Sequence, residues 1–248
     1  MKNILTPGNR EVLDQFAFSN VLVAFDYDGT LAPIVADPEC AAMRPRTRAL
    51  LEGLAEIYPC VVISGRAKAD TRARLYGIGV RGVVGNHGGE VRRGLNGFAH
   101  EVSRWRPLLE AKLSGQQGVT IEDKAYSIAI HYRRSRQKRK AREAALRAAA
   151  SLGPIRIVVG KQVVNLLPRG APHKGDALER ERERLGCDTA IYVGDDDTDE
   201  DVFRLDQPGR LLTIRVGAKQ ASQARYCIRD QRQVDVLIGA LSTLRMRR

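Results

Sequence analysis

The chain has 248 residues, which at about 150 residues per domain corresponds to one or two domains with a sizeable core. Its residues are 43% hydrophobic and 28% charged. No apolar run approaches the roughly 18 residues of a membrane span, so the composition excludes disordered, fibrous and membrane-spanning proteins. The 41 basic and 29 acidic residues give a net charge of +12. This charge indicates an anionic partner, which the composition leaves open as a nucleic acid, a membrane surface or a phosphorylated metabolite.

The N-terminal segment predicts a cytoplasmic protein, and the spacing of the cysteines argues against a zinc ribbon and a redox motif. Residues 1–20 contain Pro7, Glu11 and Asp14 but lack the apolar stretch followed by small residues of a secretory signal. The cysteines are far apart and form no CxxC pair, so we expect buried, reduced thiols at all four positions: Cys40, Cys60, Cys187 and Cys227.

Short apolar runs alternate with amphipathic stretches in the N-terminal part of the chain, a pattern typical of a parallel sheet covered by helices. Strands buried on both faces are expected at 21–25, 60–63 and 82–84. Helices are expected between these strands, one starting at Pro45 with an apolar stripe through Ile57 and one over 70–76.

The pattern then changes to an αββαββ order and changes back near Lys174. The middle segment predicts helices over 101–113 and 137–152 and strands over 119–121, 127–131, 155–159 and 163–167. After it come a helix over 174–185, strands at 190–193, 211–216 and 226–228, and a last helix over 234–244. We therefore expect a doubly wound α/β domain, residues 1–92 with 168–248, interrupted by an α+β cap, residues 93–167.

Polar groups follow three of the predicted parallel strands. Asp26 and Asp28 come directly after 21–25, Ser64 follows 60–63, and Asp195 follows 190–193. The carboxyl ends of parallel strands meet at one edge of the sheet, where open α/β folds bind ligands. Lys174 starts a helix and could reach the same edge. This set of groups suits Mg²⁺, which prefers carboxylate oxygens, and a phosphate, which prefers N–H groups, hydroxyls and lysine.

The acidic run from Asp195 to Asp201 contains more carboxylates than one metal ion needs. Thr198 with Asp201 can act as a helix cap, and the first turn of a helix favours negative charge. We therefore expect Asp195 to bind the metal ion directly. Asp196 and Asp199 are expected to orient this ligand without binding the metal themselves.

The segment from Arg133 to Arg142 carries seven basic residues in ten. It has no interleaved aromatic residue, so a solvated face is the simplest interpretation. Attraction of an anionic substrate and binding of nucleic acid stay open as alternatives.

Several of these segments together resemble the haloacid dehalogenase (HAD) superfamily of phosphatases and, within it, the trehalose-6-phosphate phosphatase family. The resemblance runs in order from about residue 20 to 205, with an insert that resembles a C2-type cap. It is carried by the DYDGTLAPI segment from Asp26, Ser64-Gly65-Arg66, the NHGGE segment from Asn86, Glu122-Asp123-Lys124 with Ser127, the HYR segment from His131, Pro168, Lys174-Gly175 and the YVGDDDTDEDVF segment from Tyr192.

The resemblance implies a fold and a mechanism. The fold would be a HAD-like, Rossmann-type parallel sheet core with the inserted cap. Asp26 would attack phosphorus and form an aspartyl-phosphate, and Asp28 would protonate the departing sugar oxygen and later activate water. Mg²⁺ would be held by Asp26, the backbone carbonyl of Asp28 and Asp195. The phosphate would be bound by Ser64, Lys174 and the amides of Gly29 and Thr30.

The resemblance also implies a sugar site. Glu122 and Lys124 would reach the sugar from the cap, and Arg66, Asn86 and His87 from the core. The family pattern has an acidic residue three positions before Pro168, where this chain has Asn165. An amide still binds hydroxyl groups, but for Glu122, Lys124 and Asn165 a purely structural role on the strand faces also stays open.

We therefore expect a Mg²⁺-dependent phosphatase that acts on trehalose 6-phosphate in trehalose biosynthesis. The expected partner is a small sugar phosphate, with neither nucleic acid nor membrane. Two alternatives stay open, namely the same chemistry on another sugar or glycoside phosphate, and a polyanion-binding protein on the same scaffold.

Overall fold

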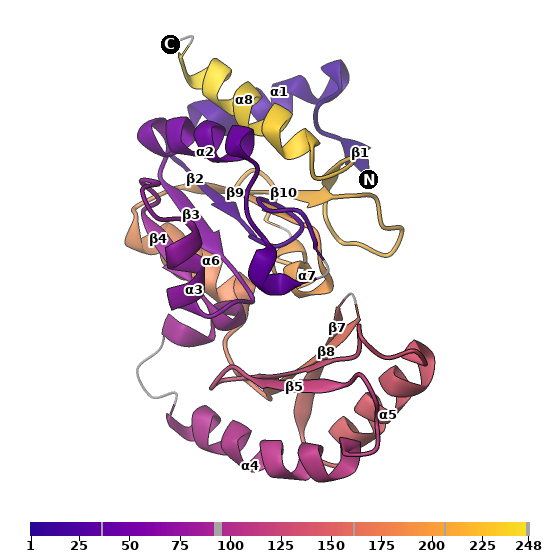
Figure 1. Ribbon diagram of the computed structural model, residues 1–248. Coiled ribbons are helices and arrows are strands. Elements are labelled where there is room, and N and C mark those ends of the chain that lie inside the picture. The colour runs from indigo at the N-terminus through magenta and orange to yellow at the C-terminus, as the bar shows by residue number, and fades with distance from the viewer. Residues whose placement is uncertain (36, 92–95, 161, 206, 247–248) are drawn as a thin grey trace. The chain divides into compact units, whose positions relative to one another are not determined.

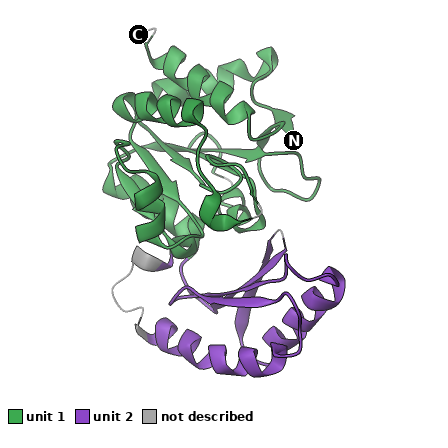
Figure 2. Ribbon diagram, in the orientation of Figure 1, with its two compact units in different colours: residues 1–88, 173–248 green, residues 89–172 purple. Residues whose placement is uncertain are grey.

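A computed structural model describes residues 1–35, 37–91, 96–160, 162–205 and 207–246. The chain divides into two compact units (Figure 2). Residues 1–88 with 173–248 form the core unit, and residues 89–172 form the insert unit. The boundary expected between residues 92 and 93 falls on residues 92–95, outside the described part of the chain.

The core unit is built on one parallel sheet of seven strands (Figure 1). The strand order β1-β11-β10-β9-β2-β3-β4 places the strands that precede the predicted site residues, β9, β2 and β3, side by side. The apolar runs expected as strands are all found in it. The strands are β1 (Lys2–Asn3), β2 (Val21–Phe25), β3 (Cys60–Ile63), β4 (Gly82–Val84), β9 (Thr189–Gly194), β10 (Leu211–Val216) and β11 (Tyr226–Ile228).

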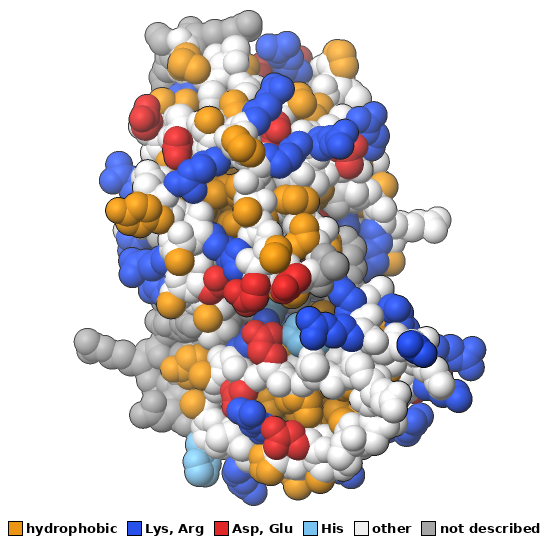
Figure 3. Space-filling view, viewed as in Figure 1, with side chains coloured by type: hydrophobic (Ala, Val, Ile, Leu, Met, Phe, Trp, Pro, Cys, Tyr) orange, Lys and Arg blue, Asp and Glu red, His pale blue; other side chains and the backbone are white. Residues whose placement is uncertain are grey.

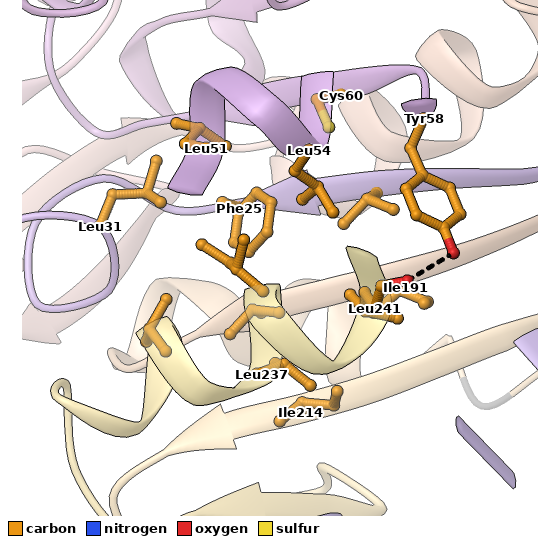
Figure 4. Packing of buried hydrophobic residues seen from close by; sticks show 14 of the residues in the cluster. Phe25, Leu31, Leu51, Leu54, Tyr58, Cys60, Ile191, Ile214, Leu237 and Leu241 are labelled. Carbon is orange, nitrogen blue, oxygen red and sulfur yellow. Dashed lines mark hydrogen bonds between the residues drawn. The ribbon is translucent and has the colours of Figure 1, made fainter. Parts of the chain in front are cut away.

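One face of this sheet is covered by α1 (Arg10–Phe18), α2 (Pro45–Ile57) and α8 (Gln233–Met246). The sequence analysis did not predict α1. Figure 4 shows the packing, in which leucines of α2 and α8 lie over Phe25 and Ile191 of the sheet. Each fully buried leucine of this kind contributes about 1.5–3 kcal/mol to stability through lost contact with water. The central strands are therefore held rigidly from this side.

The opposite face carries the alternate residues of the same strands, including Ala24, Val61 and Tyr192, which are fully buried. Helix α6 (Lys174–Arg184) contacts β3, and α3 (Lys68–Arg74) contacts β4. The short α7 (Glu200–Phe203) contacts α6. The remaining turns of the core unit are 3₁₀ helices η1 (Pro7–Asn9), η2 (Pro38–Cys40) and η4 (Asp197–Asp199); η3 (Asn86–Val91) runs from the core unit into the insert unit.

The insert unit has its own antiparallel sheet, in the order β5-β6-β8-β7, and its own helices. One hydrophobic cluster joins Trp105 and Leu109 of α4 to Ile130 and Leu166 of the sheet and to the alanines of α5. The αββαββ order expected from the sequence is found. The elements are α4 (Asn96–Leu113), β5 (Thr120–Asp123), β6 (Ile128–His131), α5 (Lys138–Ala150), β7 (Ile155–Gly160) and β8 (Val163–Pro168).

The chain leaves the core unit at Gly88 and returns to it at His173, and these two points touch. Gly88 has φ +103°, and a Cβ atom there would lie 2.5 Å from the carbonyl oxygen of His173. Only glycine fits both the backbone conformation and this close approach. The two ends of the inserted segment are therefore fixed next to each other.

Two expectations about the whole chain can be compared with the structure. None of the described helices is long and apolar enough to cross a bilayer. All four cysteines are free thiols, and Cys60, Cys187 and Cys227 are buried. The expectation was wrong for Cys40, which is exposed because it lies at the end of the surface turn η2.

Candidate functional site

The turn after β2 places Asp26 inside the protein and Asp28 at its surface. Asp26 is 4% exposed, and its amide donates to the carbonyl of Val193 on the neighbouring strand. Gly29 follows with φ +88°, and a Cβ atom there would lie 2.3 Å from the carboxylate of Asp195. The turn therefore requires glycine at position 29, because its backbone packs directly against a carboxylate from another strand.

The amides of Gly29 and Thr30, expected to bind phosphate, both donate within the turn. The Gly29 amide donates to the carbonyl of Ala32 at 2.7 Å, and the Thr30 amide to that of Tyr27 at 3.4 Å. The second bond is long, so the Thr30 amide is the more available of the two for a ligand.

The turn after β3 holds Ser64, which is fully buried, and its Oγ accepts a hydrogen bond from the amide of Arg66 at 3.1 Å. A second turn, after β4, packs against it. The amide of Asn86 donates to the carbonyl of Arg66, and that of His87 to the carbonyl of Ser64. Asn86 and His87 are buried and have φ +48° and +56°, a left-handed conformation that side chains rarely adopt. The backbone thus brings all four of these predicted residues together.

Lys174 is the cation of the site. It is the first residue of α6, whose start is fixed by a capping box between His173 before it and Asp176 in the first turn. Its side chain is buried, and Nζ donates to Oδ1 of Asp26 at 2.8 Å and to Oδ1 of Asp199 at 2.7 Å. Lys174 therefore joins the carboxylate after β2 to the acidic turn after β9.

Both carboxylate oxygens of Asp199 accept hydrogen bonds. Its Oδ1 accepts from Lys174 and from the hydroxyl of Tyr192, and its Oδ2 accepts from the amide of Asp196. Asp196 and Asp199 form the capping box of η4, so the cap expected at Thr198 with Asp201 lies two residues earlier. The reason is that the 3₁₀ turn begins directly after the strand, before Thr198 is reached.

Burial and crowding dominate the electrostatics of these groups. Burial raises the pKa of the Asp26 carboxyl well above its usual range, Lys174 opposes this, and Asp199 and Asp195 raise it further. Burial lowers the pKa of Lys174, but the charges of Asp199 and Asp26 outweigh it and raise the pKa overall. Lys174 therefore stays charged, and one cation faces three buried carboxylates.

The three carboxylates have the chemistry of a divalent cation site. Asp26, Asp195 and Asp199 each offer an oxygen, and these oxygens lie within 4.8 Å of one another. Hard divalent cations prefer such oxygen ligands, and their charge would offset the excess negative charge of the cluster. The three hydrogen bonds that Asp199 already accepts favour Asp26 and Asp195 as the direct ligands.

Arg66 lies against Asp28. Its Nε and Nη2 donate to the two oxygens of Asp28 at 2.6 and 2.8 Å, and Nη1 donates to Asp70 at 2.8 Å. Burial lowers the pKa of Arg66, but Asp28 and Asp70 outweigh it and raise the pKa overall, so Arg66 remains a cation. Arg66, which we expected to bind the sugar, thus binds the Asp28 carboxylate of its own unit in this structure.

In the insert unit, two of the three predicted sugar residues share one row across the sheet. Glu122 of β5 lies opposite Ala129 of β6, which lies opposite Asn165 of β8. Residues opposite each other in antiparallel strands point to the same face. This face is the one that α4 and α5 leave uncovered, because the alternate residues Ile130 and Leu166 belong to the cluster under these helices.

Lys124 follows β5, and its Nζ lies 3.7 Å from Oε2 of Glu122. The same Glu122 oxygen lies 2.7 Å from Nε2 of His131. Lys124 is largely buried, with its side chain 14% exposed, whereas the Glu122 side chain is 52% exposed. Glu122 is therefore the more accessible of the two residues, and it is held from two sides.

The basic segment 133–142 lies at the surface of the insert unit. Arg133 is half-buried, and Arg139 pairs with Glu143. The other six basic side chains of the segment, with Arg139 among them, are exposed: Arg134, Arg136, Lys138, Arg139, Lys140 and Arg142. On the face drawn in Figure 3, Lys and Arg side chains are scattered over the surface rather than confined to one block. This distribution fits a solvated basic surface.

Two residues that the sequence analysis missed contribute to the site, Tyr192 and Arg215. Tyr192 binds Asp199, and Arg215 donates to the backbone carbonyls of Asp195 and Asp196. A signal for Arg215 was present, because it is a charged residue inside the otherwise uncharged run of β10.

Comparisons with known proteins agree with the geometry. The family model described as trehalose-phosphatase matches residues 24–231. The trehalose-phosphate phosphatase of Mycolicibacterium paratuberculosis is 35% identical over 208 residues, which cover 77% of this chain and 52% of that protein. The probable trehalose-phosphate phosphatase 4 of Oryza sativa is 29% identical over 234 residues, which cover 86% of this chain and 64% of that protein. The chain thus spans about half to two thirds of the length of these relatives.

A solved structure supports the fold. The C-terminal domain of the trehalose-6-phosphate phosphatase of C. albicans superposes with a TM-score of 0.82 at 23% identity, covering 95% of this chain and 98% of that one. The expected fold class, a HAD-like parallel sheet core with an inserted α+β unit, is thereby confirmed, as is the resemblance seen in the sequence.

Proposed function

Because the chain belongs to the trehalose-phosphatase family, we propose that it hydrolyses trehalose 6-phosphate to trehalose and phosphate with the help of Mg²⁺. One observation carries the chemistry of this proposal: buried Lys174 bridges Asp26 and Asp199 beside Asp195, at the carboxyl ends of β2 and β9. Such a set of carboxylates with one lysine suits transfer of a phosphoryl group to a carboxylate.

In the first half of the proposed reaction, one carboxylate oxygen of Asp26 attacks phosphorus. The new bond joins that oxygen to phosphorus, and the bond from phosphorus to the sugar oxygen breaks. Asp28 gives a proton to the departing sugar oxygen. Since Arg66 donates to both oxygens of Asp28, at least one of these hydrogen bonds has to open as the sugar oxygen approaches.

In the second half, water attacks the phosphorus of the aspartyl-phosphate while Asp28 accepts its proton. The bond between phosphorus and Asp26 breaks, which releases phosphate and restores the carboxylate. Ser64, Lys174 and the Thr30 amide are the groups that we assign to binding the phosphoryl oxygens. Bound Mg²⁺ would neutralise negative charge on these oxygens and orient them, held by Asp26, the carbonyl of Asp28 and Asp195, with Asp196 and Asp199 orienting the ligands from behind.

The sugar contacts are assigned to both units. In the insert unit we assign Glu122, Lys124 and Asn165, of which Glu122 and Asn165 share one sheet face. In the core unit we assign Arg66, Asn86 and His87. The left-handed backbone of Asn86 and His87 is the kind of local strain that functional sites retain.

Asn165 favours a second candidate, the same chemistry on another sugar or glycoside phosphate. It is 5% exposed and stands where the family pattern has an acidic residue. An amide donates as well as accepts hydrogen bonds, whereas a carboxylate only accepts, so the set of hydroxyl groups that fits this position differs.

The test is phosphate release from trehalose 6-phosphate and from a panel of other sugar phosphates, with Mg²⁺ and with EDTA. Asp26→Asn is the blank, because it keeps the shape of the nucleophile and removes its charge. We expect Mg²⁺-dependent release that favours trehalose 6-phosphate and is lost in the blank.

Equal rates across the panel would support phosphatase activity and reject a preference for trehalose 6-phosphate. Release by Asp26→Asn at the rate of the unchanged protein would reject the aspartyl-phosphate mechanism. No release from any substrate, together with salt-sensitive binding of polyanions, would favour the binding protein instead.

A further inference from the structure

Arg215 is a buried cation that the proposed mechanism does not use. It lies near the end of β10, is 5% exposed, and pairs with Glu200 of α7 at 2.9 Å. The side chains of both residues are almost fully buried. A buried charge of this kind is costly unless its partners satisfy it, so the hydrogen bonds that Arg215 makes indicate its role.

The Arg215 guanidinium binds the backbone of the acidic turn as well as Glu200. Its Nη2 donates to the carbonyl of Asp195, and its Nη1 donates to the carbonyl of Asp196 at 3.2 Å. The pairing of β10 with β9 ends at Arg215 opposite Gly194, so these two carbonyls lie just beyond the last pair of the ladder. Beyond the last backbone pair of β10 with β9, the Arg215 side chain therefore supplies the hydrogen bonds to the backbone that follows β9.

Fixing these two carbonyls fixes the peptide planes on both sides of Asp196. One plane sets the direction in which Asp195 projects its carboxylate. The same plane carries the amide of Asp196, which donates to Oδ2 of Asp199 at 2.8 Å. Two of the three carboxylates of the cluster thus depend on the hydrogen bonds of Arg215.

We propose that Arg215 is a positioning residue for the cation site, because it holds the turn that presents Asp195 and Asp199. This inference rests on the proposed use of a divalent cation but not on the identity of the sugar. Lysine does not replace arginine here, since a single ammonium lacks the planar fork that reaches Glu200 and both carbonyls together.

A second buried arginine provides a matched control. Arg182 of α6 is also 5% exposed, pairs with Glu179 and donates to the backbone carbonyl of Asp188 at 3.2 Å. Arg182 thus repeats the burial, the ion pair and the carbonyl contact of Arg215, but it has no hydrogen bond to the turn of Asp195 and Asp196 among the described contacts. Its loss measures the general effect of removing a buried arginine.

The experiment titrates Mg²⁺ into the EDTA-stripped full chain by calorimetry, without substrate. The variants are Arg215→Met, Arg215→Lys and the control Arg182→Met, each with its urea unfolding curve. We expect Arg215→Met to raise the Kd for Mg²⁺ by about tenfold or more, as is usual when a residue that orients the metal ligands is lost. Arg215→Lys keeps a charge beside Glu200 and is expected to weaken binding less, while Arg182→Met leaves the Kd unchanged.

The outcomes separate this inference from the proposed function. Unchanged Mg²⁺ binding in both Arg215 variants would overturn it, and so would equal weakening in Arg182→Met. If Arg215→Met does not fold, Arg215→Lys decides. Mg²⁺ binding by the unchanged protein without phosphate release would reject the proposed substrate and leave this inference standing. No Mg²⁺ binding at all would overturn the inference whatever the substrate.

Discussion

Asp199 and Asp195 are similar carboxylates with different surroundings. Asp199 accepts three hydrogen bonds, from Lys174, Tyr192 and the amide of Asp196, so it holds the site together. Asp195 adds a negative charge that raises the pKa of Asp26. Asp199 raises that pKa as well, but its three hydrogen bonds offset the repulsion that it adds.

This difference predicts unequal effects of two chemically identical substitutions. Asp199→Asn places an amide group against a backbone N–H or the Lys174 ammonium, and we expect it to lower the free energy of unfolding by about 1–3 kcal/mol. Asp195→Asn removes a negative charge that raises the pKa of Asp26, so we expect the EDTA-treated protein to lose less stability than with Asp199→Asn. Urea unfolding without metal measures both values. Equal destabilisation by the two substitutions would contradict this account.

The residues after the strands were predictable from the sequence, and their partners were not. Asp26, Ser64 and Asp195 each follow an apolar run, and the topology of a parallel sheet brings such positions to one edge. The contacts of Arg66 with Asp28 and of Tyr192 with Asp199 depend on side-chain packing between or within turns. No periodicity in the sequence reports such packing.

Among the elements, α5 shows how small side chains set a packing distance. Its buried face consists of alanines at helical spacing: Ala141, Ala144, Ala145, Ala148 and Ala149. Alanine keeps the helix backbone close to its neighbours, and it also has the highest helix propensity. A larger side chain on this face has no space without shifting the helix.

Ala145→Leu tests this packing. Ala145 is fully buried, so we expect the added atoms to lower the free energy of unfolding of the insert unit by about 1–3 kcal/mol. Ala150→Leu is the matched control, because Ala150 ends the same helix and is exposed. Trp105 belongs to the same cluster, so its emission during urea unfolding is the measurement. Equal stability of the two variants would show that the face is not tightly packed.

Elements with long periodic patterns were found close to their predicted bounds, whereas the short N-terminal helix was missed. Helix α1 buries Leu13, Phe16 and Ala17, a pattern visible in the sequence but spread over only nine residues. Such a short helix is stabilised by packing, here against α8, rather than by its own propensity. Contacts with a segment more than 200 residues away are not encoded locally.

At the scale of the whole molecule, the hydrophobic cluster between the sheet and α1, α2 and α8 in the core unit shares no described residue with the cluster of the insert unit. Trp105, the single tryptophan, lies in the cluster of the insert unit. Its fluorescence therefore reports on the insert unit, while the far-ultraviolet circular dichroism reports on both units.

We expect urea unfolding to give different midpoints by these two signals, because each unit has a core of its own. Asp199→Asn should move the circular dichroism curve and leave the Trp105 midpoint in place, and Ala145→Leu should move the Trp105 midpoint. Coincident transitions in all variants would show instead that the two units unfold as one.

The contact of Gly88 with His173 has a consequence for the history of such a chain. Because the points of departure and return already touch, the inserted segment can be shortened, exchanged or removed without rejoining distant ends of the core unit. The sheet that carries the carboxylates can then be inherited unchanged while the inserted segment is replaced. The close approach at Gly88 thus lets the length of the inserted segment change while the ends of the core unit stay in place.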